Sequence, residues 1–244
     1  MCRGEPNPIG NLSNINQVGY INSNLVNETK SDQFPDLSIT KQLYTLNDTV
    51  HLHLMLNATR YNELTEWFIK GKNMFNPLLI LHPTLLHPFS RGNLSLASTN
   101  IDDPPLIYPN FLDSNTTDLV VLMAGVNHVL NMLNTNSTGF GDFELLDITS
   151  PNCLPYDFKT EAYWNCTMKA LARPTGQPVG TCRMGTDPMN NDVVNERLKV
   201  FGMNNLRVVD GSVIPTITAG DGTTTNVMMA EKAAYYILYD TYFG

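Results

Sequence analysis

The sequence predicts an α+β fold, in which an antiparallel or mixed sheet with flanking helices is followed by a further strand and helix. Two observations lead to this prediction. Short apolar runs separated by Gly, Pro and Asn occupy the first part of the chain, as expected for strands joined by turns. Two later segments, near residues 119–133 and 223–239, instead place apolar residues at helical spacing.

The predicted strands are short. Residues 18–21 (Val-Gly-Tyr-Ile) form an apolar segment within a region rich in Asn, Ser and Gly. Residues 78–81 (Leu-Leu-Ile-Leu) form another, which Pro83 is expected to end. Leu94 and Leu96 then alternate with polar neighbours. These segments are typical of an antiparallel or mixed sheet.

The clearest predicted helix begins at a cluster of capping residues over 114–118. Its apolar residues recur every three or four positions and form one stripe: Leu119, Leu122, Met123, Val126, Leu130 and Leu133. His128 lies off this stripe, so we interpret it as a polar-face residue rather than a catalytic group.

The C-terminal part reads as strand, turn and helix. Residues 206–210 predict a buried strand, 211–218 a turn, and 223–239 a helix capped by Thr224 or Thr225. The apolar positions expected on the buried face of this helix are Val227, Ala230, Ala234, Ile237 and Leu238. We also expect Met228, Met229 and Cys182 to be packed side chains, with no chemical role.

Charge and hydropathy exclude two classes of partner. The formal net charge of -8 argues against nucleic acid and anionic membranes, because both select a basic surface. No window approaches the ~18 to 20 apolar residues that a membrane helix needs. His51 and His53 are spaced like a metal pair, but no further ligands lie in register, so no metal site is predicted.

Signals for the cellular compartment conflict. The N-terminus has no apolar signal-peptide core, which by itself favours a cytosolic protein. Eight Asn-x-Ser/Thr sequons favour the secretory pathway, although about half that number could arise by chance in an Asn-rich chain. They are at Asn11, Asn27, Asn47, Asn57, Asn93, Asn115, Asn136 and Asn165. Under the secretory interpretation, a signal peptide lies upstream of Met1 and the chain is a C-terminal piece of a longer precursor.

Cysteine spacing leaves two alternatives open. Cys153 and Cys166 lie in a loop-like segment and form either a disulfide or two unrelated thiols. Cys2 and Cys182 are isolated.

Motifs spread along the chain carry a family resemblance. Residues 177–185 read Gln-Pro-Val-Gly-Thr-Cys-Arg-Met-Gly, and 206–217 read Leu-Arg-Val-Val-Asp-Gly-Ser-Val-Ile-Pro-Thr-Ile. Residues 228–234 read Met-Met-Ala-Glu-Lys-Ala-Ala. Upstream lie Leu-His-Pro-Phe-Ser-Arg-Gly at 86–92 and Pro-Pro-Leu-Ile-Tyr-Pro-Asn-Phe at 104–111. Together they resemble the C-terminal portion of the glucose-methanol-choline (GMC) family of FAD-dependent oxidoreductases.

The Tyr-Trp-Asn-Cys context at 163–166 is similar to the arthropod, glucose dehydrogenase-like members of the family. That similarity implies both the Cys153–Cys166 disulfide and a secreted lineage.

The resemblance also implies a function and a division of the chain. It implies oxidation of the CH-OH group of an alcohol or sugar by FAD. Residues 1–170 then correspond to the substrate-binding domain, and 171–244 to the catalytic element with the closing strand and helix of the FAD-binding domain. The family's Gly-x-Gly-x-x-Gly turn, which holds the ADP half of FAD, is not found here. We therefore expect an incomplete FAD site. Either a separately supplied N-terminal half is the partner that completes it, or the chain is an incomplete gene product.

Two departures from the family lie at the chemical centre. Gln177 stands where the family carries its catalytic histidine, and Asp221 stands where it carries Asn or His. A glutamine amide can orient a hydroxyl group, but it has no proton equilibrium with which to deprotonate one. An ionised Asp221 would add negative charge beside the flavin, unless it is protonated or has itself become the base.

The resemblance places cofactor-binding positions at Asp210, Gly211, Gly220, Gly222 and Thr223. The simpler alternative is that Asp210 and Ser212 are only turn formers. For the whole site, we weigh an oxidoreductase in which Asp221 or a water held by Gln177 takes the proton. The alternatives are a catalytically inactive scaffold and a flavin-dependent lyase, which would also need the histidine.

Overall fold

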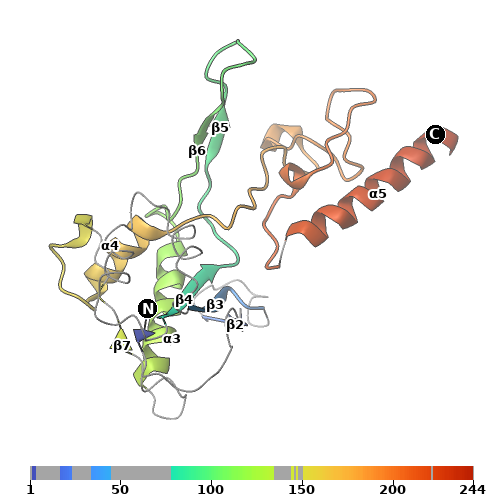
Figure 1. The fold of residues 1–244 in the computed structure, drawn as a ribbon. Helices are drawn as coiled ribbons and strands as arrows, with labels where there is room; N and C mark the ends of the chain where they lie inside the picture. Colours follow the sequence, from blue (N-terminus) through green and yellow to red (C-terminus); the bar gives the residue numbers. More distant parts are fainter. Residues whose placement is uncertain are drawn as a thin grey trace. The chain divides into compact units, whose positions relative to one another are not determined.

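The structure is a computed structural model that describes residues 2–3, 17–23, 34–44, 78–134, 144–145, 147, 151–220 and 222–243 (Figure 1). The chain divides into two compact units. The first contains residues 1–85 and 119–171, and the second contains residues 86–118 and 172–244. We describe each unit separately.

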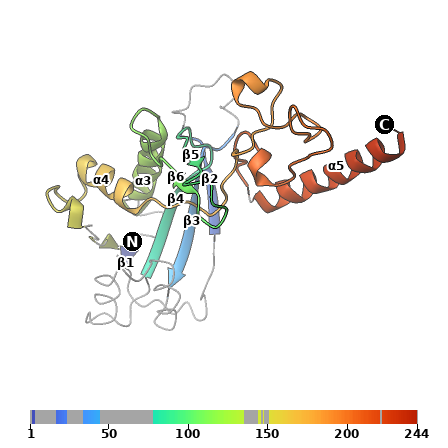
Figure 2. The same cartoon turned by 90° about the horizontal axis from the view of Figure 1, so that it is seen from above.

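The first unit contains a sheet of five strands within the described residues, in the order β2-β3-β4-β1-β7. Each neighbouring pair is antiparallel, which confirms that part of the prediction. The central pair, β3 and β4, lies side by side in Figure 2 with Leu37 opposite Leu85 and Tyr44 opposite Leu78. The strand bounds are β1 Cys2–Arg3, β2 Gln17–Ile21, β3 Leu37–Tyr44, β4 Leu78–Leu85 and β7 Glu144–Leu145.

The prediction that Pro83 ends its strand is wrong. β4 continues to Leu85, and Pro83 lies opposite Ile39 of β3. Proline is tolerated in a strand where its missing N–H is not needed by a ladder. In the described residues, β1 contacts β4 only at Leu78 and Leu79. At Pro83, β4 therefore has a described partner strand on one side alone, which is β3.

Helix α3 (Asp118–Asn134) lies against this sheet, and part of the predicted stripe is buried. The most buried apolar residue of the helix, Val121, lies off that stripe. Leu122 and Val126 are buried, and His128 is exposed, as expected. The closest approach is at Gly125, where an added Cβ would lie 2.9 Å from Cβ of Pro83 and 3.5 Å from Leu37. Only a residue without a side chain allows this backbone to approach the sheet so closely.

A disulfide joins Cys153 and Cys166, with Cα atoms 5.7 Å apart, and confirms the pairing. Cys153 lies in the 3₁₀ turn η3 (Pro151–Cys153), and Cys166 lies in helix α4 (Glu161–Leu171). Both Cys153 and the neighbouring Tyr163 of α4 are almost fully buried. The disulfide therefore attaches the turn to the buried side of α4.

The second unit begins with a hairpin of β5 (Asn93–Ser95) and β6 (Leu106–Tyr108). Every residue of both strands is exposed. An added Cβ on Gly92 would meet the Tyr108 carbonyl oxygen at only 2.2 Å, so this position requires glycine. At the other end of the same segment, the buried Asp118 carboxylate accepts the backbone N–H groups of Phe89 and Ser90 at 2.7 and 2.8 Å.

The rest of the second unit is a loop-rich core closed by helix α5 (Gly222–Phe243). Its buried members are Val194, Leu198, Val213, Ile214, Met229 and Ala233, and Cys182 packs against them as an unpaired thiol. The same unit contains two short 3₁₀ turns, η4 (Pro188–Asn190) and η5 (Gly211–Val213). Among the described helices, none is long and apolar enough to cross a membrane.

Two predictions for this core are wrong. Residues 206–210 do not form a buried strand, because only a single bridge, Lys199 to Arg207, forms there. In α5, the buried residues are Met229 and Ala233, whereas Met228 is 57% exposed. The stripe of Val227, Ala230, Ala234, Ile237 and Leu238 is exposed as well. This helix carries apolar residues nearly all round, so periodicity alone does not select the face that packs.

An ionic cluster joins the far end of α5 to the loops beneath it. Asp240 lies within 2.6 Å of Lys199 and also pairs with Arg197 and Arg207. The Arg197 guanidinium stacks over the Tyr236 ring at 4.8 Å. The hydrogen bond to Lys199 and the charges of the cations lower the pKa of Asp240 to about 2.

Candidate functional site

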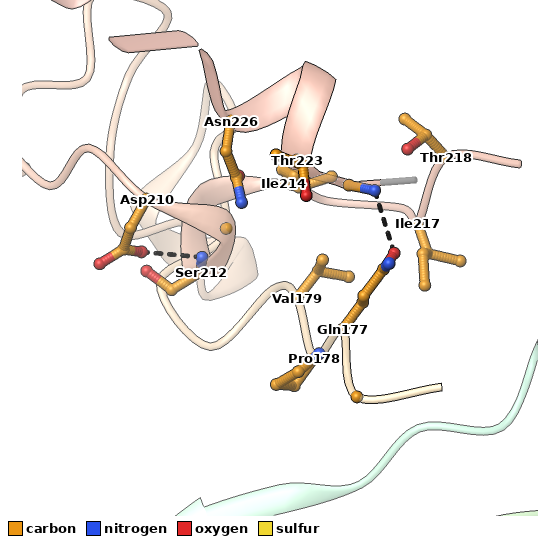
Figure 3. Close-up of a pocket in the computed structure, with 13 residues that line it drawn as sticks. Gln177, Pro178, Val179, Asp210, Ser212, Ile214, Ile217, Thr218, Thr223 and Asn226 are labelled. Carbon is orange, nitrogen blue, oxygen red and sulfur yellow. Dashed lines mark hydrogen bonds between the residues drawn. The ribbon is translucent and has the colours of Figure 1, made fainter. Parts of the chain in front are cut away.

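A cavity of about 420 Å³ lies in the second unit, where three segments meet. They are residues 176–179 at the start of the signature motif (residues 177–185), residues 210–218 around η5, and the first turn of α5 (Figure 3). Three of its thirteen lining residues, Gly176, Gly211 and Gly222, have no side chain, so backbone atoms form part of the wall.

Backbone hydrogen bonds hold the first two segments together. The N–H of Cys182 donates to the Ser212 carbonyl, and that of Met184 to the Val213 carbonyl, both at 2.9 Å. Val213 and Ile214 are buried below, and Val179 packs against the same cluster. The signature motif is therefore held on the hydrophobic core, so its Gln177 end has a defined place.

The Gln177 side chain reaches across the cavity to the start of α5. Its Oε1 accepts the backbone N–H of Gly222 at 3.0 Å (Figure 3). The first N–H groups of a helix have no partner within the helix, so Gln177 caps α5 from a distant part of the chain. A Cβ on Gly222 would lie 3.2 Å from Oε1, which is tighter than most such contacts and favours glycine there.

This cap corrects one prediction. Thr224 and Thr225 lie inside α5 and do not begin it. The Thr225 hydroxyl instead lies 3.3 Å from that of Thr218.

Asp210 has a local structural role. Its carboxylate accepts the Ser212 backbone N–H at 2.8 Å and caps η5. Hydrogen bonds from the side chain and then the backbone of Ser212 lower the pKa of Asp210, so this carboxylate is anionic at neutral pH. The turn-forming role is therefore confirmed, whereas contact with a cofactor stays a prediction.

The structure brings most of the predicted site residues to one place. Gln177, Asp210, Gly211, Gly222 and Thr223 all line the cavity. Gly220 does not line it, and Asp221 lies outside the described residues. Gln177, which stands where the family carries its histidine, already uses its amide oxygen to accept the N–H at the start of α5.

Besides Ser212, seven lining residues were not among the predicted site residues: Gly176, Pro178, Val179, Ile214, Ile217, Thr218 and Asn226. The signal for Asn226 was available, because a residue four positions after Gly222 lies on the same face of a helix. Its amide lies 3.5 Å from where a Cβ on Gly211 would be, so it borders η5 as well.

These residues fit the polar edge of a flavin ring. The start of α5, a 22-residue helix with no acidic residue in its first turn, presents the positive end of a helix dipole. The space beside Gly222 is taken by the Gln177 amide, and that beside Gly211 by the Asn226 amide, so both glycines bring polar side chains close to the backbone. Among the described residues, no group of His, Cys, Asp or Glu could hold a metal ion.

Comparisons with known proteins identify the family of the chain. The family model described as GMC oxidoreductase matches residues 88–230, which include the hairpin and all three cavity segments. The chain is 35% identical over 159 residues to glucose dehydrogenase [FAD, quinone] of Drosophila pseudoobscura pseudoobscura. That match covers 64% of this chain and 25% of the relative. It is 31% identical to ecdysone oxidase of Spodoptera littoralis, over 69% of this chain and 27% of the relative.

Solved structures show the same fold. Pyridoxine 4-oxidase from Mesorbium loti superposes with a TM-score of 0.61 at 19% identity, over 93% of this chain and 38% of that one. A fungal aryl-alcohol oxidase gives 0.51 at 26% identity, over 67% and 25%. The chain thus spans about a quarter of the length of the curated relatives it matches. By the motif, the fold and the family match together, this chain belongs to the GMC oxidoreductase family.

Proposed function

We propose that this chain is the C-terminal part of an FAD-dependent oxidoreductase that acts on CH-OH groups of alcohols or sugars. Residues 171–244 provide the flavin-facing element, and residues 1–170 correspond to the substrate-binding domain. The observation that carries the proposal is the cavity itself, in which the family's signature motif, η5 and the start of α5 converge.

Within this proposal, Gln177 does not accept the proton of the substrate hydroxyl group, because an amide can orient a hydroxyl group but not deprotonate it. When bound, FAD supplies the acceptor for the hydride that leaves the substrate carbon. Thr223 and the α5 dipole would stabilise negative charge on the flavin edge, worth about 0.3 to 1 kcal/mol at an exposed helix end. Gln177 holds the helix start in place. General-base catalysis, worth about 10² to 10⁴ in rate, then falls to Asp221 or to a water held at Gln177.

A catalytically inactive scaffold is the second candidate, and one observation favours it. Gln177 Oε1 is engaged with the Gly222 N–H, so the position of the family's catalytic group serves a structural contact. A neutral amide cannot replace the missing proton equilibrium. In this alternative, the cavity binds a flavin or another flat ligand without turnover.

The proposal has two further parts, which are a source for the ADP-binding part of the FAD site and a secretory route for the chain. Residues 1–244 contain no Gly-x-Gly-x-x-Gly turn, so a dinucleotide-binding part outside these residues would hold that end of FAD. The Cys153–Cys166 disulfide and the sequons support passage through the secretory pathway and glycosylation there. This route is tested independently of any activity by monitoring a tagged chain in cell fractions, with and without brefeldin treatment.

Flavin reduction tests the two candidates. The chain is co-purified with a dinucleotide-binding half, loaded with FAD and mixed anaerobically with a panel of alcohols and sugars. Loss of the oxidised-flavin absorbance in the natural sequence supports the oxidoreductase and excludes the inactive scaffold. Reduction only after Gln177→His with Asp221→Asn supports the scaffold. Failure of both proteins, with FAD still bound, contradicts the CH-OH oxidoreductase proposal.

A further inference from the structure

We propose that Asn93 and Asn115 carry N-linked glycans and that Asn165, which has the same sequon, does not. The inference rests on the secretory route of the proposed function and assigns which of the sequons that route uses. Only three of the sequon asparagines lie within the described residues. Asn11, Asn27, Asn47, Asn57 and Asn136 lie outside them.

The modification sets a geometric requirement. The asparagine Nδ2 forms a bond to the anomeric carbon of the first sugar of a lipid-diphosphate-linked oligosaccharide. The bond from that carbon to phosphate breaks, the lipid diphosphate leaves, and the amide loses one proton. The folded protein must then accommodate a bulky, hydrated group at that side chain, which requires a position on the surface.

Asn93 meets this requirement. It is exposed on β5, as are Leu94 and the sequon hydroxyl residue, Ser95. Within the described residues, the only ladder partner of β5 is β6, so one edge of this short strand has no described neighbour. A glycan on such an edge would also hinder pairing with another chain, because an exposed edge strand is a template for association.

Asn115 meets it in a different way. It lies in the tight turn before α3, where its backbone N–H donates to Asp113 Oδ1 at 3.0 Å. Its Nδ2 donates to the same oxygen at 3.1 Å. A glycosylated amide keeps one N–H, so this contact survives the modification. Asn115 and Thr117 are both exposed.

Asn165 does not meet it. It is half-buried, and it lines a groove of about 270 Å³ between α3 and α4 together with Leu119 and Met123. The next residue, Cys166, is bonded to the buried Cys153, and the sequon hydroxyl residue, Thr167, is only 8% exposed. Two of the three sequon positions are therefore fixed against the interior of the folded unit. Folded molecules therefore have Asn165 unmodified.

The test supplies the secretory route, so it does not depend on the natural location of the protein. The full chain is expressed behind a host signal peptide in insect cells. The secreted product is then treated with an N-glycosidase in ¹⁸O-labelled water, and peptides are mapped by mass spectrometry. We expect the labelled Asn-to-Asp conversion at 93 and 115, and an unconverted asparagine at 165. Conversion at 165 in the folded product, or none at both 93 and 115, would overturn the proposal.

Variants give an independent readout. Asn93→Gln and Asn115→Gln should each remove the mass of one glycan, and so should Ser95→Ala and Thr117→Ala, which keep the asparagine. Asn165→Gln is the matched control and should leave the glycan mass unchanged. Cys153→Ala with Cys166→Ala keeps an Asn-Ala-Thr sequon while releasing α4 from the turn. Occupancy at 165 should then rise in the total expressed chain, and no rise would contradict burial as the cause.

Discussion

The hydrogen bond between Gln177 and Gly222 predicts that residue 177 stabilises the fold. Gln177→Ala removes an acceptor that lies 3.0 Å from the first N–H of α5. Loss of an N-terminal helix cap costs typically about 1 kcal/mol, within a range of about 0.5 to 2. In a domain of about 150 to 250 residues, 1 kcal/mol lowers the melting temperature by roughly 2 to 4 °C. We expect a decrease of this size.

Gln177→Glu distinguishes loss of the cap from the effect of simply changing residue 177. A carboxylate retains the acceptor oxygen and adds negative charge at the positive end of the α5 dipole. We therefore expect the melting temperature of the Glu variant to equal or exceed that of the natural protein at pH 7. Thr175→Ala, an exposed change in the same segment, is the control and should have no measurable effect.

The measurement is thermal unfolding followed by circular dichroism, with urea titration at fixed temperature as a second estimate. The reasoning is refuted if Gln177→Ala and Thr175→Ala have the same melting temperature. It is also refuted if Gln177→Glu is destabilised as much as Gln177→Ala, since both outcomes mean that no cap is made.

Three further predictions concern stability. Met229→Ala should destabilise by about 2 to 5 kcal/mol in urea titration, whereas Met228→Ala should stay within about 0.5 kcal/mol; equal effects would mean that α5 packs on another face. Replacing Cys153 and Cys166 by Ala opens a loop with a sequence separation of 13 and should lower the unfolding free energy by about 3 kcal/mol, whereas Cys182→Ala, the free-thiol control, should cost less. Asp240 has a folded pKa of about 2, below the ordinary value of about 3.9, so its stabilisation is complete above pH about 4 and is lost as pH falls towards about 2. Asp240→Asn should remove that part of the acid dependence of the melting temperature, and an unchanged profile would contradict it.

Much of the fold and part of the site could be predicted from local patterns. The α3 stripe was predicted because one face of that helix is apolar and the other is polar, so periodicity identifies the buried side. The five cavity-lining residues were predicted from motif resemblance, which carries the order of residues along the chain. Asn226 was missed because it lies between the motifs at 206–217 and 228–234, and it becomes a neighbour of η5 only in the folded molecule.

The wrong predictions share a cause, since each treated a local preference as if it decided packing. Pro83 disfavours a strand only where its N–H is needed, and one-sided pairing removes that need. Residues 206–210 have high strand propensity, but a strand requires a ladder, and a single bridge forms in the structure. Thr224 and Thr225 are good capping residues, yet the acceptor comes from residue 177.

The sequence by itself determined the family, an antiparallel or mixed sheet, the helix α3 and the replacement of histidine by Gln177. These follow from residue identity and from spacing along the chain. Only the tertiary structure decided which face of α5 is buried, where the disulfide lies, and that Gln177 binds the Gly222 N–H. The physical reason is separation along the chain. Gln177 and Gly222 are 45 residues apart, and such a contact forms only when the hydrophobic core has brought the two segments together.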